Sequence, residues 1–89
     1  MANLESFSMT GIKMWFWPND HNPPHFHAKR TGEWEIKVRF LESDEAMLEI
    51  AWAKKKKSIS RTDRKTLIEQ VKKHRFEIFR EWEQKVKPQ

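Results

Sequence analysis

The spacing of the apolar residues changes once along this chain of 89 residues, and that change constrains the fold most. Between Glu33 and Phe40, apolar and charged residues alternate strictly, which is typical of a β-strand with one buried face. From Ser60 onward, the apolar residues recur at three- and four-residue steps, which predicts an amphipathic helix. They are Leu67, Ile68, Val71, Ile78, Phe79, Trp82 and Val86. The chain therefore divides into a β-rich part and a helical end.

Three more segments have the composition of strands. Gly11–Trp17 is rich in aromatic residues, His25–Arg30 is followed by a Thr-Gly turn, and Ala46–Ala53 alternates, although its residues also suit a helix. We expect an α+β fold, with a small, mostly antiparallel sheet of three to four strands within residues 10–53. One C-terminal helix at residues 61–86 is expected to pack against it, with Ser60 or Thr62 as its cap.

Length and composition restrict the class of protein. The chain is long enough for one domain, residues 1–89. It contains no Cys, which excludes a disulfide scaffold, a zinc finger and a thiol nucleophile. No apolar run is long enough to span a membrane, and the first residues lack the basic start and apolar stretch of a signal peptide. We therefore expect a cytoplasmic protein without a membrane partner.

Positive charge is concentrated in the second part of the sequence. Residues 54–89 contain 13 Lys and Arg against 5 Asp and Glu, whereas residues 1–53 contain 5 against 8. Such a basic segment predicts an anionic partner, with nucleic acid as the first candidate. The alternative is an ordinary solvated helix face. The residues predicted to bind phosphate are Lys54, Lys55, Lys56, Lys57 and Arg61.

The most unusual segment is Asp20–His27, which has the sequence DHNPPHFH and contains three of the four histidines. Its two prolines are expected to hold the loop extended, and Asp20 and His21 are predicted binding residues. In an extended chain His25 and His27 point the same way, a pair suited to chelating a divalent metal with His21 or Asp20 as a third ligand. The alternative is a rigid loop without a cofactor, whose imidazoles bind backbone groups and stack on aromatic rings.

The same histidines raise a second class of function, a metal-independent ribonuclease. RNA cleavage needs a base for the 2′-hydroxyl proton, an acid for the leaving oxygen and a cation for the phosphate. His25 and His27 would be base and acid, and Lys29 or Arg30 would stabilise the developing charge. Two imidazoles this close repel each other when one is charged, which counts against this alternative.

The positions of Trp15, Trp17 and His74 predict which way these side chains point. Trp15 and Trp17 lie on the strand face opposite Met14, so we expect them to point outward unless something covers them. The N-terminal segment, a second copy of the chain or a stacked base would serve as that cover. His74 falls on the helical apolar stripe, where we expect a half-buried side chain with a partner rather than a metal ligand.

Residues 17–29 (WPNDHNPPHFHAK) resemble the signature of the bacterial domain-of-unknown-function family numbered 4160. Members are about as long as this chain, and they end in a helix with a Trp and a His-Arg pair, similar to Trp82 and His74-Arg75 here. The resemblance covers residues 10–83. It implies a small protein partner encoded by a neighbouring gene, in a toxin–antitoxin-like pair. With the basic C-terminal portion, it predicts an interaction protein that binds this partner and nucleic acid.

Overall fold

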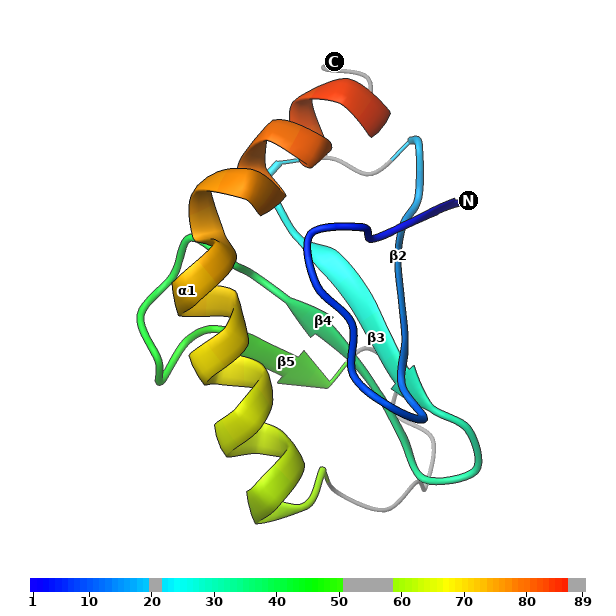
Figure 1. Ribbon diagram of the computed structural model, residues 1–89, viewed down its shortest axis with the longest axis vertical. Helices are drawn as coiled ribbons and strands as arrows, with labels where there is room; N and C mark the ends of the chain where they lie inside the picture. The colour runs from blue at the N-terminus through cyan, green and yellow to red at the C-terminus, as the bar shows by residue number, and fades with distance from the viewer. Residues whose placement is uncertain (20–21, 51–58, 87–89) are drawn as a thin grey trace.

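The computed structural model describes residues 1–19, 22–50 and 59–86. Figure 1 shows a helix lying across one face of an antiparallel sheet, so the α+β prediction is confirmed. The sheet has five strands rather than three to four. The elements are β1 (Ala2–Asn3), β2 (Lys13–Phe16), β3 (Phe26–Arg30), β4 (Trp34–Val38), β5 (Leu48–Ile50) and α1 (Arg61–Lys85).

The strands lie side by side in the order in which they occur in the sequence, and every neighbouring pair is antiparallel. β3 and β4 form the central hairpin, in which Ala28 lies opposite Ile36. Gly32 has a φ of +79° in the turn between them, a conformation that favours glycine. The strand missing from the prediction is β1, because two residues are too few to show a periodic pattern.

Alternate residues of the sheet face α1 and form the core. Those on β2, β3 and β4 are at most 7% exposed: Met14, Phe16, Phe26, Ala28, Trp34, Ile36 and Val38. From α1, the buried residues are Leu67, Val71, Ile78 and Trp82. The residues of β2, β4 and α1 match the faces predicted from the two periodicities, whereas Phe26 and Ala28 of β3 have no predicted face. The sheet therefore has one face against the helix and one face away from it.

α1 begins where the sequence predicts. The Ser60 side chain caps the helix by accepting a hydrogen bond from the backbone N–H of Asp63 at 3.1 Å. The helix is kinked at His74, whose φ and ψ are −109° and 15°. The His74 ring stacks on Phe7 with 5.7 Å between centroids, and its Nδ1 lies 3.1 Å from a Glu77 carboxylate oxygen. His74 is thus the half-buried, partnered side chain that its position indicates.

The first nine residues form an N-terminal arm: Ala2–Asn3 pairs with β2 as the edge strand β1, and the residues that follow lie between β2 and α1 in Figure 1. Leu4 and Phe7 of this arm are each 8% exposed and belong to the core. The backbone N–H of Leu4 donates to the Met14 carbonyl at 3.0 Å. The sequence predicts this segment as one possible cover for Trp15 and Trp17. Leu4 and Phe7 instead close the core between the sheet and the helix.

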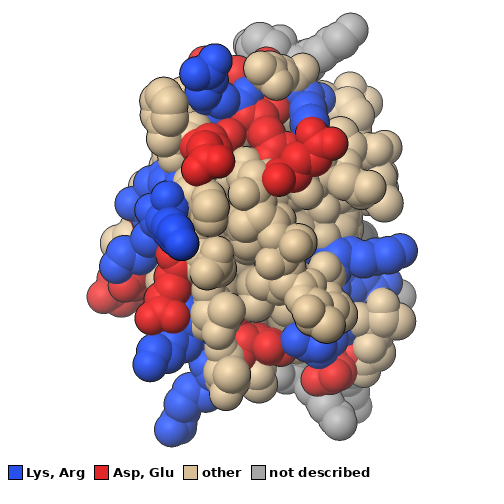
Figure 2. Space-filling view, in the orientation of Figure 1, with Lys and Arg blue, Asp and Glu red and all other residues tan. Residues whose placement is uncertain are grey.

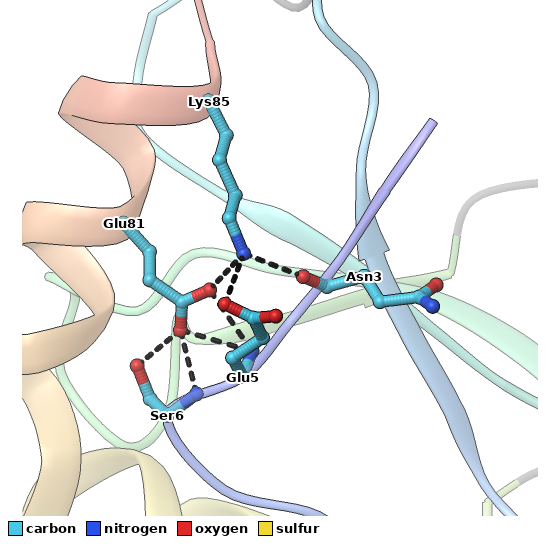
Figure 3. Close-up of polar contacts among 5 residues, drawn as sticks. All are labelled: Asn3, Glu5, Ser6, Glu81 and Lys85. Atoms are coloured by element: carbon cyan, nitrogen blue, oxygen red, sulfur yellow. Dashed lines mark hydrogen bonds and ion pairs between the residues drawn. The ribbon is translucent and has the colours of Figure 1, made fainter.

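One carboxylate fastens the arm to the last turns of the helix (Figure 3). The Glu81 side chain accepts hydrogen bonds from the backbone N–H groups of Glu5, at 2.9 Å, and Ser6, at 2.6 Å, and from the Ser6 hydroxyl. Lys85 donates to Glu81 at 2.6 Å and to the Asn3 carbonyl at 2.8 Å. The arm is therefore held by polar contacts as well as by its two core residues.

These contacts perturb both ionisable groups. Burial raises the pKa of Glu81, but the hydrogen bonds from Lys85, Ser6 and Glu5 outweigh it, so the pKa lies below the ordinary value of 4.5. Burial lowers the pKa of Lys85, but its bonds to Glu81 and Glu5 outweigh burial and raise the pKa above 10.5. Both groups are charged at neutral pH, and each favours the charge of the other.

Candidate functional site

His25 lies at the point where the loop after β2 enters β3. Its Nδ1 lies 2.9 Å from the carbonyl oxygen of Pro23, and the Asn22–Pro23 peptide bond is cis. The His25 ring lies 5.7 Å from the Trp82 ring of α1 and 5.1 Å from the His27 ring. His25 is 5% exposed, and His27 is 9% exposed. The structure thus brings the two predicted histidines together, but both are buried.

His27 belongs to an aromatic cluster on the sheet face away from α1. It lies opposite Trp15 in the β2–β3 register, and the two rings stack with 5.7 Å between centroids. Trp17 contacts both rings edge-on, at 6.2 Å from Trp15 and 6.4 Å from His27. Trp15 is 6% exposed, whereas Trp17 is 45% exposed. Of the two tryptophans expected to point outward, Trp17 alone is exposed.

The predicted three-ligand metal site is only partly within the described residues. Asp20 and His21 lie outside them, so the third ligand stays a prediction. Within residues 1–19, 22–50 and 59–86, no group of three or more His, Cys, Asp or Glu side chains is placed to hold a metal ion. His25 and His27 supply the pair that the spacing predicts, with ring centroids 5.1 Å apart.

The two cations proposed for catalysis take different positions. Lys29 lies two residues after His27 on the same face of β3, opposite Lys13 and Glu35 in the neighbouring strands. Arg30 instead donates two hydrogen bonds to the Asp63 carboxylate, at 2.8 and 3.0 Å. This pairing lowers the pKa of Asp63 and raises that of Arg30. Arg30 thus connects the end of β3 to the start of α1.

A second candidate site lies on one side of α1. We define the basic flank as Arg61, Arg64, Lys65 and Lys72, which line a groove of about 370 Å³ together with Asp44, Ile68 and Glu69. The four cations outnumber the two carboxylates, and all four are exposed. Lys72 pairs with Asp44 across the groove at 3.3 Å. Figure 2 shows blue side chains, with red ones between them, along the edge of the molecule where α1 lies.

The sequence predicted only one member of the basic flank. This member is Arg61; the lysine run Lys54–Lys57 predicted with it lies outside the described residues. Arg64, Lys65 and Lys72 are not part of the prediction, because the net charge of residues 54–89 does not show which cations share one side of a helix. The sequence does contain that signal, since spacings of three, four and eleven residues from Arg61 place the three cations on one helix side.

The opposite side of α1 is engaged with the protein itself. Asp63 pairs with Arg30, Glu77 with His74, and Glu81 with the N-terminal arm. Acidic groups on this side therefore have internal partners, whereas the basic flank faces outward. In the groove itself the four cations outnumber the two carboxylates, Asp44 and Glu69, so the net charge there favours an anion.

Comparisons with known proteins agree with the resemblance noted in the sequence. No curated protein and no solved structure matches the chain significantly. Among the helices of the described ranges, none is long and apolar enough to cross a membrane. The model of one protein family, described as a domain of unknown function (DUF4160), matches residues 11–83. This match spans the sheet from the turn before β2, the His25–His27 pair and nearly all of α1, so the chain belongs to the DUF4160 family.

Proposed function

We propose that this protein is a small cytoplasmic interaction protein of a toxin–antitoxin-like pair, and that its basic flank binds the phosphate backbone of nucleic acid. The single observation that supports this function is the groove on α1, where four exposed cations line one continuous surface. Lys54–Lys57 precede α1 in the sequence and would add charge to the same binding function. The small protein partner belongs to the same proposal and follows from the family resemblance.

The physical argument is electrostatic. Each phosphate neutralised by Lys or Arg releases condensed counterions, so affinity falls as salt rises. The positive end of the helix dipole lies near Arg61 and Arg64 and favours anions there. Lys72 is partly neutralised by Asp44, so we expect the strongest phosphate contacts from Arg61, Arg64 and Lys65.

The test measures binding of a fluorescein-labelled oligonucleotide by anisotropy at several salt concentrations. The double variant Arg64→Gln/Lys65→Gln should weaken binding and flatten the plot of log affinity against log salt by about 1.8 for duplex DNA. Lys13→Gln on β2 is the matched control, because Lys13 is exposed and lies outside the groove. Wild-type protein that shows no binding at low salt would contradict the proposal.

The protein partner needs a separate experiment. Co-expression with the product of the neighbouring gene should give a complex that elutes as one species in size-exclusion chromatography. A homo-oligomer through Trp15 and Trp17 is the competing arrangement, and Trp17 is its exposed member. Light scattering on the wild type and on Trp17→Ala separates the two, since only a homo-oligomer would dissociate in that variant alone.

The ribonuclease is kept as the second candidate, because the His25 and His27 rings lie 5.1 Å apart. Their burial at 5% and 9% counts against catalysis, since a base and an acid must reach the phosphodiester. Incubation with labelled RNA in EDTA tests it. Cleavage that persists and is lost in folded His25→Ala and His27→Ala variants would establish the enzyme. Metal that stays bound through purification and is lost in the same variants would instead indicate a metal-binding module.

A further inference from the structure

An aromatic side chain stands exposed on α1 beyond the groove. Phe76 is 72% exposed and does not belong to the core. It lies one helical turn after Lys72, on the same side of the helix, and one turn before Arg80. The guanidinium of Arg80 lies over the Phe76 ring, 5.9 Å from its centroid. Burial therefore gives no reason for a phenylalanine at this position.

The charges around this ring are those that a polyanion requires. Lys72, Lys73 and Arg80 all lie within about one turn of Phe76 and are exposed. The nearest carboxylate in sequence, that of Glu77, lies 3.1 Å from His74 Nδ1 and is 60% exposed, so three cations stand against one carboxylate around the ring. The basic flank thus continues along α1 into a surface that combines cations with one aromatic ring.

We propose that this extended surface binds single-stranded nucleic acid in preference to duplex, with one base stacked on Phe76. The inference rests on the proposed function, and it adds the class of nucleic acid. In a duplex the base faces are stacked on each other, whereas an unpaired base has a free π-face for an aromatic side chain. Arg80 holds one side of the aromatic ring by a cation–π contact and contributes positive charge for the adjacent phosphate.

The dimensions of the surface fit this ligand. From Arg64 to Arg80 the helix rises about 24 Å, at 1.5 Å per residue. Single-strand binding sites of OB folds accommodate about 4–16 nucleotides by combining a basic groove with aromatic side chains on which bases stack. The basic flank would follow the backbone, and Phe76 would hold one base at the far end.

The test compares a 12-nucleotide oligo(dT) with a 12-base-pair duplex in the same anisotropy assay, at one fixed salt concentration. Wild-type protein should bind the single strand more tightly. Phe76→Ala should weaken single-strand binding by about 5- to 150-fold and leave duplex binding within about twofold. Phe76→Trp should keep the single-strand affinity of the wild type, because Trp retains an aromatic face. Leu41→Ala is the matched control, because Leu41 is another exposed apolar side chain, at 44%, outside the groove lining.

The outcomes separate this inference from the proposed function. Absence of binding to either oligonucleotide overturns the proposed function and the inference with it. Equal binding to both, unchanged in Phe76→Ala, leaves nucleic-acid binding intact and overturns the stacking inference alone. A wild-type dimer that dissociates in Phe76→Ala without a change in oligonucleotide affinity would assign Phe76 to a second copy of the chain, and would also overturn it.

Discussion

Replacing Glu81 by Gln should loosen the N-terminal arm, because this carboxylate holds it to the helix. Glu81 accepts hydrogen bonds from two backbone N–H groups, one hydroxyl and one ammonium, and its side chain is 12% exposed. Hydrogen bonds to charged groups contribute about 1.5–3 kcal/mol each, but bonds that share one acceptor are not additive. Gln retains an acceptor oxygen, so we expect a loss of about 2 kcal/mol in the free energy of unfolding.

That loss corresponds to a fall in Tm of roughly 8–16 °C for a domain of this size. Glu83→Gln is the matched control, because Glu83 is an exposed carboxylate on the same turns of α1. Urea denaturation at pH 7 gives the difference in free energy between the two variants. Equal stability of Glu81→Gln and Glu83→Gln would refute the role of Glu81 as the fastener of the arm.

The pH dependence provides a second check. Because the folded pKa of Glu81 is below 4.5, its contribution is complete above pH 4.5 and is lost as the pH falls through the folded value. The stability difference between wild type and Glu81→Gln should therefore shrink when the denaturation is repeated near pH 3. The contribution of Lys85, whose pKa is raised above 10.5, is complete below pH 10.5 and is lost as the pH rises through its folded value. A difference that stays constant from pH 7 to pH 3 would contradict the electrostatic part of the argument.

Three further predictions concern the core, a turn and an ion pair. Ile78→Ala should cost about 2–5 kcal/mol in urea denaturation, because Ile78 is fully buried; a loss below about 1 kcal/mol would contradict its place in the core. Gly11→Ala should lower Tm more than Gly32→Ala, because both have positive φ but only at Gly11 would the new Cβ meet Arg30, at 2.7 Å; equal shifts would show that Arg30 moves freely. Asp63→Asn should lower Tm at pH 7. The difference in Tm from the wild type should vanish as the pH falls below 3.8 through the lowered folded pKa of Asp63. A Tm difference that persists at that low pH would assign the effect to the helix cap and not to the ion pair with Arg30.

Elements with a periodic pattern could be predicted from the sequence. The alternation from Glu33 to Phe40 predicted both β4 and its buried face. If the strand were turned over, its charged side chains would be buried and its apolar ones exposed. The stripe from Leu67 to Val86 predicted the contact face of α1 for the same reason. These patterns are local, so they can be read without knowledge of the partner element.

Features that depend on distant partners could not be predicted. β1 forms because Ala2 and Asn3 pair with β2, and the adjacent arm is fixed by a glutamate 75 residues further on. His25 is buried in part by Trp82, a residue of α1 that lies far away in the sequence. The spacing of His25 and His27 predicted that the two rings are close, but not that α1 covers one of them.

The contact between the arm and Glu81 determines when the arm can fold during synthesis. The arm leaves the ribosome first, yet its polar partner is 76 residues from Glu5 and is added about 4–15 s later at 5–20 residues per second. During that interval the nascent chain can pair β2, β3 and β4 through neighbouring hairpins, while Leu4 and Phe7 have no helix to cover them. A nascent chain halted before α1 should therefore expose apolar surface that chaperones recognise.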